Sequence, residues 1–440
     1  MDWVHLLSTQ RQGQKTGPTE SSRSVFEKDF DRIIFSHPFR KLQDKTQVHP
    51  LPEHDFVHNR LTHSLEVSSV GRSLGRKAGE TIVQRHEDLK KDYTAFDVGA
   101  IVASASLAHD VGNPPFGHAG EEALSEFFTQ NPSGLFFKDL VSPEAWADLT
   151  HFEGNAQGFR ILNSNQYGLN LTLATLGAYT KYPRGAGLEN RNKERKSQKK
   201  FGFFQTEKEN FISLSNELRL KPTPEGAWIR HPLAFLVEAA DDICYNIIDL
   251  EDGCRLGLIS FDETVTLLEG ILGTRLDKAK LNSKIGLNEK LGVLRAMTIA
   301  ELIDACSMTF LDHEQDILEG TYDKALTDVC SHQKALSLIE EVSIAKIYRA
   351  RHVMEIETTG YEVLPGLLQE FALAGKLYLE GGKRGKYRNL IQLLPEEVRY
   401  GLDQPQTSMY GMLRLILDFL SSLTDRHALS LFRKLKGISL

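Results

Sequence analysis

The chain has 440 residues, and 52 Lys and Arg against 59 Asp and Glu give it a formal net charge of −7 at pH 7. This acidic balance excludes a general electrostatic attraction to nucleic acid or to anionic membranes, so any site for an anion must be built locally. The sequence has no run of eighteen apolar residues and no signal-peptide pattern at its start, which predicts a cytoplasmic protein.

Residues 1–24 are predicted to be a flexible N-terminal tail, because positions 8 to 24 are rich in Gln, Ser, Thr, Gly and Lys. From Val25 onward the apolar residues repeat with helical spacing. Three strongly apolar helices are expected, in "RLTHSLEVSSVGRSLGRKAG", "TAFDVGAIVASASLAHD" and "HPLAFLVEAADDICYNIIDLEDG". The second is crowded with small residues, so a neighbouring backbone can approach it closely. Gly253 is expected to cap the end of the third.

The helical period continues to the C-terminus, and no alternating strand pattern competes with it. The sequence therefore predicts an all-α fold with at most short β pieces, near "KTQVHPLPEH" and "KFGFFQTE". We expect a core at residues 25–290, with a mobile basic loop near 184–200, and a C-terminal helical region at 291–440. The amphipathic helices of that last region are expected to complete the pocket and to form an oligomer. The four cysteines lack metal-binding spacing and are predicted to be reduced core thiols.

A vicinal His109–Asp110 pair stands at the end of the second apolar helix, followed by Gly112, Pro114 and Pro115. Adjacent residues on a helix point about 100° apart, so both can reach one metal ion most easily near the end of the helix. The prolines end the helix there and leave room for a metal ion, a water molecule and a substrate. By itself the dipeptide is weak evidence, because ordinary packing of the His and capping by the Asp explain it more often.

Further metal ligands are available on the other two apolar helices. His63 lies on the first, and Asp241 and Asp242 lie in the middle of the third, where an apolar surround makes a carboxylate costly unless it is paired or bound to metal. A solvated helix face is the alternative explanation for the two aspartates. Together His63, His109, Asp110 and Asp241 form a set of two nitrogen and two oxygen ligands that suits Mn, Fe, Mg or Zn.

Several longer strings occur in one order along the chain: "RLTHSLEV", "HDVGNPPFGHAGEE", "HFEGNAQGFRIL", "KYP", "KFGFFQTE" and "EAADDICYNIIDLEDG". In these strings the chain resembles the bacterial deoxyguanosine triphosphate triphosphohydrolases, a family within the HD-domain superfamily. The resemblance runs from about residue 25 to residue 375. The H…HD…D set indicates only the superfamily, whereas "HDVGNPPFGHAGEE" followed by "EGNAQ" is specific to the triphosphohydrolases.

The resemblance implies an HD-domain helical core and places the metal ligands of the family on His63, His109, Asp110 and Asp241, with Mn or Mg as the favoured ion. It implies a reaction in which water attacks the α-phosphorus of a deoxynucleoside triphosphate (dNTP) and releases the deoxynucleoside and intact triphosphate. The sequence contains no GxxxxGK[ST] motif, which argues against an ordinary NTPase that cleaves the γ-phosphate.

The leaving sugar oxygen of such a reaction requires a proton. His118 and Glu121 follow the proline turn three residues apart, so the carboxylate can orient the imidazole and raise its basicity. His118 as a cap of the following helix is the plainer alternative. The catalytic His and Glu of the family match these two positions. His151 is a further candidate for the acid–base network.

Asp241, Tyr245 and Asp249 are spaced along one face of one helix, so this helix can hold the metal at one point and reach the sugar further along. The resemblance implies that Tyr245 packs against the deoxyribose and that Asp249 binds the 3′-hydroxyl. Tyr245 as an ordinary core residue is the alternative. Asp242 points elsewhere around the helix and is expected to bind a neighbouring helix.

The triphosphate requires local cations, since the chain as a whole is acidic. Arg60 lies one turn before the first histidine ligand, and the family uses an Arg there. Lys181 and Lys200 are further candidates, with solvated loop lysines as the alternative, and Gln47 matches a family position near the sugar and base. Asn113 stands where many relatives have His, and the sequence does not identify the preferred base.

Two other function classes remain open from the sequence. Another HD-domain phosphohydrolase, a nucleotidase or a phosphodiesterase, can use the same metal set with a different product. A nucleic-acid-binding regulator can use the basic stretches "RNKERKSQKK" and "GGKRGKYR" for phosphate contacts, although solvated loops explain both. Members of the family can respond to single-stranded DNA and assemble as hexamers, so the resemblance implies both as partners here, with a second copy of the chain forming the homo-oligomer.

Overall fold

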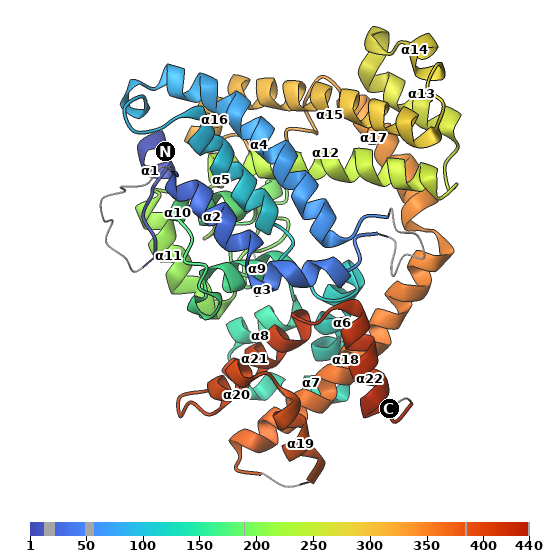
Figure 1. Ribbon diagram of the computed structural model, residues 1–440. Helices are drawn as coiled ribbons and strands as arrows, with labels where there is room; N and C mark the ends of the chain where they lie inside the picture. Colours follow the sequence, from blue (N-terminus) through green and yellow to red (C-terminus); the bar gives the residue numbers. More distant parts are fainter. Residues whose placement is uncertain (13–22, 49–56, 189, 383–384, 439–440) are drawn as a thin grey trace.

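The computed structural model describes residues 1–12, 23–48, 57–188, 190–382 and 385–438 (Figure 1). These residues form helices, and their backbone pairing outside the helices is limited to isolated bridges such as Thr46–Asn59 and Gly185–Phe203. Both bridges touch the stretches in which short β pieces are expected. The all-α prediction is therefore confirmed. Within the described residues no helix is long and apolar enough to cross a membrane.

The helices form two groups, each with its own buried apolar cluster. The first group packs around one central helix, α12, and occupies the upper part of Figure 1. Its members are α1 (Trp3–Leu6), α2 (Val25–Ile34), α3 (His37–Arg40), α4 (Arg60–Arg85), α5 (Ala95–Ala108), α10 (Leu173–Tyr179), α11 (Lys208–Glu217), α12 (Pro232–Arg255), α13 (Phe261–Leu272), α14 (Lys278–Asn282), α15 (Leu287–Asp312), α16 (Glu314–Glu319) and α17 (Gln333–Ser343).

The second group lies below the first and packs around the long helix α18 (Figure 1). Helix α18 follows a π-helical turn at Ile344–Tyr348 and runs down from the first group. Helix α9 (Gly154–Asn163) contributes residues to both apolar clusters. The members of the second group are α6 (Gly117–Gln130), α7 (Pro132–Leu135), α8 (Pro143–Thr150), α18 (Arg351–Leu379), α19 (Gly385–Leu393), α20 (Glu396–Leu402), α21 (Met409–Ser421) and α22 (Asp425–Leu435).

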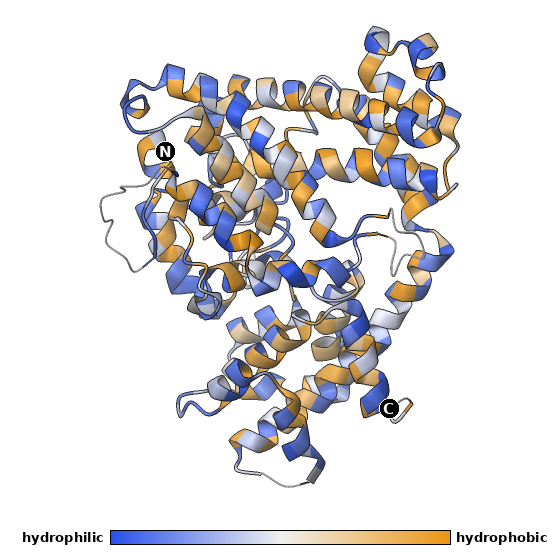
Figure 2. Cartoon of the chain, in the orientation of Figure 1, coloured by the Kyte–Doolittle hydropathy of each residue, from blue (hydrophilic) through white to orange (hydrophobic). Residues whose placement is uncertain are grey.

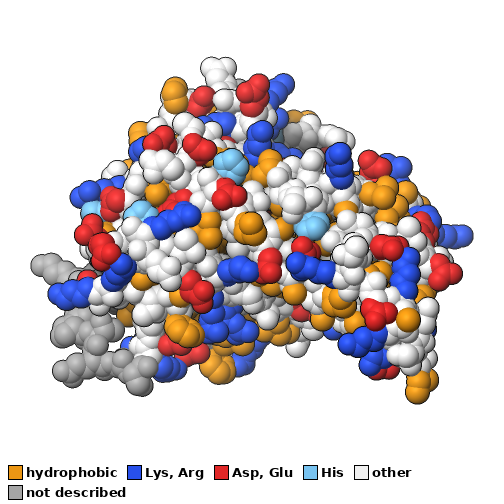
Figure 3. All heavy atoms as spheres, turned by 90° about the horizontal axis from the view of Figure 1, so that it is seen from above, with side chains coloured by type: hydrophobic (Ala, Val, Ile, Leu, Met, Phe, Trp, Pro, Cys, Tyr) orange, Lys and Arg blue, Asp and Glu red, His pale blue; other side chains and the backbone are white. Residues whose placement is uncertain are grey.

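Most helices carry apolar residues on one side and hydrophilic residues on the other (Figure 2). On the face seen from above, Lys and Arg side chains are intermixed with Asp and Glu (Figure 3). The small residues of α5 allow the close approach expected from the sequence, because a Cβ on Gly75 of α4 would lie only 3.0 Å from the Cα of Gly99. All four cysteines are buried and free, as predicted.

The first twelve residues are a correction to the predicted flexible tail. They include the short helix α1, in which Trp3 and Leu6 are buried in the first apolar cluster. The indole Nε1 of Trp3 also donates a hydrogen bond to Glu314 at 2.8 Å. Apolar anchors near the start therefore outweigh the polar composition that follows them. Residues 13–22 of the predicted tail lie outside the described residues.

The basic segment 184–200 also differs from the mobile loop expected there. Apart from residue 189, which is not described, it has contacts to both groups: Ala186 packs against the second apolar cluster, and Ser197 contacts the segment between α16 and α17. Ser197 and Gln198 are buried, and the hydroxyl of Ser197 donates a hydrogen bond to Asp323 at 2.5 Å. The many lysines and arginines of this segment predict exposure, and the composition does not indicate that Ser197 and Gln198 are buried.

Two boundaries along the chain differ from the sequence-based expectation. Helix α15 crosses the expected division at residue 290, and the last change of helix group comes at the π-helical turn before α18. Gly253 does not cap α12, which continues to Arg255. A Cβ at Gly253 would lie 2.6 Å from Ile347 Cδ1, so this glycine permits close packing rather than a helix end.

Candidate active site

Four side chains from three helices converge where α4, α5 and α12 meet. His63 lies on α4, His109 and Asp110 follow the end of α5, and Asp241 lies on α12. Asp241 Oδ1 is 3.2 Å from His63 Nε2 and 3.5 Å from His109 Nε2. His109 Nε2 is also 3.5 Å from Asp110 Oδ1. Ligand atoms of His63, His109 and Asp110 lie within 4.8 Å of one another.

The contacts around this cluster prepare it for a cation. The Nδ1 atom of His109 donates a hydrogen bond to the Ser106 carbonyl at 2.7 Å, so its Nε2 keeps a lone pair that faces the cluster. Burial alone would raise the pKa of Asp110, but the Arg60 guanidinium, 2.7 Å away, and His109 lower that pKa to about 2. The Asp241 carboxyl is partly exposed, and although its partial desolvation would raise its pKa, His109 and His63 hold that pKa well below the usual range.

This donor set fits a divalent metal ion. Two imidazole nitrogens and two ionised carboxylates suit Mn²⁺, Mg²⁺, Fe²⁺ or Zn²⁺, whereas a closed zinc site would use thiolates. The histidine rings meet edge to face, with centroids 5.3 Å apart, so both nitrogens point toward the same space. These are the four ligand candidates of the sequence analysis.

A cavity of about 570 Å³ opens beside the cluster. Ten of the residues expected at the site line it: Gln47, Arg60, His109, Asp110, His118, Glu121, Lys181, Lys200, Asp241 and Tyr245. His63 lies behind the cavity wall and is buried. The volume is of the size that small-molecule and cofactor sites usually have. Among the lining residues that the sequence analysis missed are Thr46, Phe116, Tyr179, Tyr182, Lys199, Tyr348 and Glu357.

His118 and Glu121 stand at the start of α6 and both line the cavity, but no contact between them is present. Glu121 instead accepts a hydrogen bond from the backbone of Gly154 at 2.7 Å and lies 3.7 Å from Lys200 Nζ. Burial, together with the charges of Lys200 and Arg60, lowers the pKa of His118 to about 4. This direction is opposite to the raised basicity expected from Glu121, because burial, which is the largest cause, and the two cations disfavour the charged imidazole.

His151, the third catalytic candidate, does not line the cavity. Its side chain is exposed, and its Nδ1 lies 3.0 Å from the carbonyl oxygen of Ala147 and 3.1 Å from the Thr150 hydroxyl. Both contacts are local to the end of α8, where His151 is the residue that follows the helix. The structure thus gives His151 the geometry of a helix-end residue.

The cationic candidates all carry an acidic partner. Arg60 contacts Asp110, while Lys181 Nζ lies 3.3 Å from Glu238 and Lys200 Nζ lies 3.3 Å from Glu153. The Nε atom of Arg60 is buried and has no hydrogen-bond partner. An anion that enters the cavity can therefore replace these carboxylates as the partner of the cations. It can also accept a hydrogen bond from the Nε atom of Arg60.

Tyr245 lines the cavity and stacks on Tyr348, with ring centroids 5.2 Å apart. Asp249 lies one helical turn beyond Tyr245 on α12 and does not line the cavity. Its carboxylate accepts a hydrogen bond from the Tyr348 hydroxyl at 2.9 Å. Gln47 lines the opposite wall, and its side-chain oxygen is buried without a partner. Asp242 accepts a hydrogen bond from the Thr327 hydroxyl at 2.7 Å, which comes from the segment between α16 and α17 and not from a helix.

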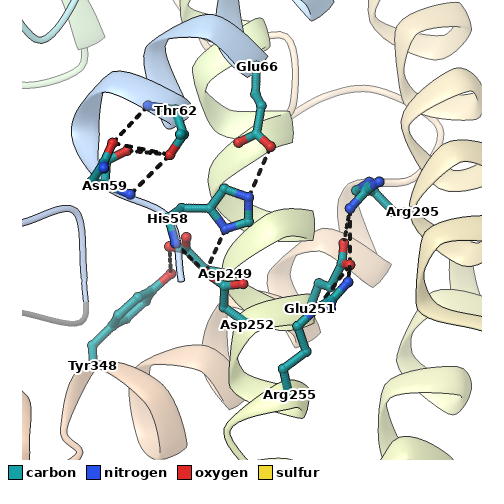
Figure 4. Close-up of polar contacts among 10 residues, drawn as sticks. All are labelled: His58, Asn59, Thr62, Glu66, Asp249, Glu251, Asp252, Arg255, Arg295 and Tyr348. Atoms are coloured by element: carbon teal, nitrogen blue, oxygen red, sulfur yellow. Dashed lines mark hydrogen bonds and ion pairs between the residues drawn. The ribbon is translucent and has the colours of Figure 1, made fainter. Parts of the chain in front are cut away.

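A second polar network fixes α4 against α12 just outside the cavity (Figure 4). His58 Nδ1 contacts Asp252 of α12 at 2.7 Å, and its Nε2 contacts Glu66 of α4 at 3.0 Å. Burial alone would lower the pKa of His58, but its hydrogen bonds to Asp252 and Glu66 raise that pKa to about 10. His58 precedes Asn59, which caps the start of α4. The sequence analysis missed this network because its members are far apart in the chain.

Comparisons with known proteins show which family the chain belongs to. A family model described as "Phosphohydrolase-associated domain" matches residues 331–434. The chain is 41% identical to a deoxyguanosinetriphosphate triphosphohydrolase-like protein of Synechocystis and 35% identical to one of Listeria monocytogenes, each over the full length of both chains. It is 29% identical to the deoxyguanosinetriphosphate triphosphohydrolase of Salmonella paratyphi A over 94% of each chain. The chain therefore belongs to the family of deoxyguanosinetriphosphate triphosphohydrolase-like proteins, a family of hydrolases.

Proposed function

We propose that the protein hydrolyses a dNTP at its α-phosphorus and releases the deoxynucleoside and triphosphate. The observation that carries this proposal is the four-ligand cluster His63, His109, Asp110 and Asp241 beside a cavity whose walls carry Arg60 and two lysines. The names of the relatives support dGTP as a substrate. The cluster would hold a divalent cation, with Mn²⁺ or Mg²⁺ favoured. When bound, that cation polarises the phosphoryl oxygens and lowers the pKa of a water molecule.

The triphosphate binds among Arg60, Lys181 and Lys200. Each of these cations contacts a carboxylate of the protein, so their positive charges are balanced within the site. Substrate phosphates then replace part of these contacts with charge-assisted hydrogen bonds. Tyr245 forms the floor beneath the sugar, and its stacking on Tyr348 keeps its ring in place.

His118 supplies the proton for the leaving oxygen. Water adds to the α-phosphorus and releases a proton to solvent, the bond from phosphorus to the sugar 5′ oxygen breaks, and that oxygen takes the proton from His118. The pKa of His118 is about 4 in the substrate-free chain, because burial, Lys200 and Arg60 disfavour its charged form. Triphosphate beside His118 reverses that effect, since its negative charge favours the imidazolium and occupies the two cations. His118 therefore gains its proton as substrate binds and regains it from solvent after turnover.

Product analysis tests this proposal. The protein is incubated with Mn²⁺ and each of the four dNTPs or GTP, and the products are separated by chromatography. We expect deoxynucleoside and triphosphate in equal amounts. The hydrolysis rate of the double variant His109→Ala, Asp110→Ala should fall by more than ~100-fold. Removing residues that only support metal ligands already lowers activity or metal affinity by about 10–100-fold.

A matched control is the double variant His313→Ala, Asp316→Ala, which removes an exposed His–Asp ion pair of 3.3 Å far along the sequence from the cavity residues. It should keep the wild-type rate. A nucleoside monophosphate or free phosphate as product would instead place the protein among other HD-domain phosphohydrolases. Turnover by the His109→Ala, Asp110→Ala variant at the wild-type rate would contradict the assigned site.

Three further properties stay predictions: the homohexamer, the response to single-stranded DNA, and the cytoplasmic location. The first is measured by sedimentation at micromolar concentration, where a monomer would contradict an oligomer. For DNA, we expect binding that weakens steeply with salt and is lost on charge reversal of Lys199 and Lys200. Both lysines line the cavity, so the charge-reversed protein must also be compared in a DNA-binding assay without nucleotide.

A further inference from the structure

Asp425 is the first residue of α22, in the C-terminal region, yet its carboxylate contacts two loops that line the active-site cavity. Its Oδ2 accepts hydrogen bonds from the backbone N–H of Thr46 at 2.9 Å and from the Thr46 hydroxyl at 2.5 Å. Its Oδ1 accepts one from the backbone N–H of Phe116 at 3.0 Å. Asp425 is only 2% exposed, so these bonds are shielded from water. Thr46 directly precedes Gln47, and Phe116 lies two residues before His118.

The Phe116 backbone adopts a conformation that a bulky residue rarely takes. Its φ is 64°, in the left-handed region, and Gly117 follows with φ 60°. This reversal turns the chain out of the proline segment and starts α6, which places His118 and Glu121 at the cavity. A left-handed conformation is unfavourable for a bulky residue such as Phe116 and persists only where the surroundings hold it.

Two contacts hold Phe116, one at its backbone and one at its side chain. The Asp425 carboxylate fixes its N–H, and α18 supports its ring, since a Cβ added to Gly360 would lie 3.0 Å from Phe116 Cβ. Both Asp425 and Gly360 belong to the second helix group. The start of α6 therefore depends on helices that are separated from it by more than two hundred residues.

Lys45 adds a parallel link between the same helices and the metal cluster. Its Nζ is buried and donates to the Ser421 carbonyl of α21 at 2.7 Å and to the Asn113 carbonyl at 2.6 Å. The Asn113 side chain in turn donates to Asp110. The segment from Asp110 to Phe116 therefore contacts the C-terminal helices at two points. Asn113, which bonds to Asp110, is linked through Lys45, and Phe116 is linked through Asp425.

From this geometry we infer that Asp425 is a positioning residue for the hydrolytic reaction: it holds the left-handed Phe116 turn and so keeps His118 and Glu121 directed at the bound substrate. This inference rests on the proposed function. Asp425 touches neither the four metal ligands nor the cationic side chains, so its removal should affect the chemical step more than the binding of substrate or metal.

The test uses Asp425→Asn, which keeps the size of the side chain but replaces one acceptor oxygen with a donor. We expect kcat to fall by about 10–100-fold, since small displacements of catalytic groups have effects of this size. KM for dGTP and the affinity for Mn²⁺, measured by calorimetry, should change by less than ~3-fold. The control is Arg426→Ala, which removes the exposed ion pair of 3.1 Å between the neighbouring residue and Asp44 and should leave kcat unchanged.

A second readout does not depend on activity. In wild-type protein the Phe116 amide should exchange slowly with deuterium, and Asp425→Asn should speed exchange in the peptide that contains residues 113–121, whereas Arg426→Ala should not. If the wild-type protein shows no dNTP hydrolysis while Asp425→Asn still speeds exchange of the 113–121 peptide, the proposed function is wrong. In that case the role of Asp425 in holding the Phe116 turn is still supported. Faster exchange with an unchanged kcat, or a lower kcat with unchanged exchange, would overturn the positioning role.

Gly360→Ala perturbs the same Phe116 turn from helix α18. It provides a second test that does not depend on whether Asp425→Asn folds. Its added methyl group must displace Phe116 by a few tenths of an ångström, while alanine favours the helix itself. We expect kcat to fall with Tm close to that of wild type. Full activity of Gly360→Ala would contradict the dependence of His118 on the Phe116 turn.

Discussion

Asp249 is a carboxyl group whose surroundings favour its protonated form. Burial raises its pKa to about 8, and the charge of Asp252 adds to that effect, although the hydrogen bond from Tyr348 opposes it. In the unfolded chain the group ionises near pH 4. Between these values the unfolded state loses its proton while the folded state keeps it, so the stability of the fold falls as pH rises from about 4 to about 8.

Asp249→Asn should therefore stabilise the protein, and more so at higher pH. The amide cannot ionise, and its oxygen can still accept the Tyr348 hydrogen bond. Each pH unit in this window is worth up to about 1.4 kcal/mol. We expect the Tm of the variant to exceed that of wild type by several degrees at pH 8 and by much less at pH 5. Asp304→Asn, at an exposed position, is the control. A Tm difference that does not grow with pH would contradict a raised pKa.

Single residues also show what the sequence can and cannot predict. His109 and Asp110 were found because they are adjacent and precede a proline turn, and the spacing of Asp241 and Tyr245 on α12 follows from helix geometry alone. The acidic partners of Lys181 and Lys200 could not be found, because Glu238 and Glu153 lie on other elements. The same holds for the pKa of His118, which depends on cations from distant parts of the chain.

At the scale of helices, His58 joins the start of α4 to α12. Its imidazolium bridges Asp252 and Glu66, and each of these carboxylates has a second oxygen that is buried without a partner (Figure 4). The two helices carry His63 and Asp241, so this bridge also sets the spacing of the metal ligands. Removal of His58 would leave the buried Asp252 carboxylate and the partly exposed Glu66 carboxylate without their shared partner.

His58→Gln should lower stability in a pH-dependent way. The folded-state pKa of about 10 lies above the ordinary value of 6.5, so the stabilisation is fully present below pH 6.5 and is lost as pH rises through 10. We expect a loss of about 3 kcal/mol at pH 6.5, typical of a broken buried ion pair, and a smaller loss at pH 9.5. The affinity for Mn²⁺ should fall as well.

Urea unfolding at the two pH values, with calorimetry of Mn²⁺ binding, measures both effects. His37→Gln, on an exposed histidine of α3 that does not line the cavity, is the control and should show neither effect. An equal loss of stability for His58→Gln at both pH values would mean that His58 acts through packing rather than through its charge.

The sequence predicted the main helices better than their partners. Apolar periodicity located α4, α5 and α12, and the small residues of α5 indicated its close contact with α4. Composition misled the analysis at the N-terminus and at residues 184–200, where a few buried side chains anchor an otherwise polar segment. Contacts such as that of Asp425 with Phe116 join residues about three hundred positions apart and leave no periodic trace.

At the scale of the whole molecule, the two helix groups meet around the cavity and do not form separable units. The second apolar cluster takes residues from α6 and α8 in the first half of the chain and from α18 to α22 in the second half. Lys45 and Asp425 add buried polar contacts across the same junction. A fold built in this way should lose both groups together when it unfolds.

We therefore expect one cooperative thermal transition, and we expect it to move as a whole when metal binds. A ligand that binds only the folded state stabilises it by about 2.7 kcal/mol at 100 times its Kd, so Mn²⁺ should raise the single Tm and EDTA should return it to the metal-free value. In the His109→Ala, Asp110→Ala variant Mn²⁺ should produce little shift. Scanning calorimetry with and without Mn²⁺ makes the measurement. Two transitions, of which only one responds to the metal, would contradict this expectation. They would show that the C-terminal helices unfold independently of the metal cluster. The contacts of Lys45 and Asp425 would then not couple the stability of the two helix groups.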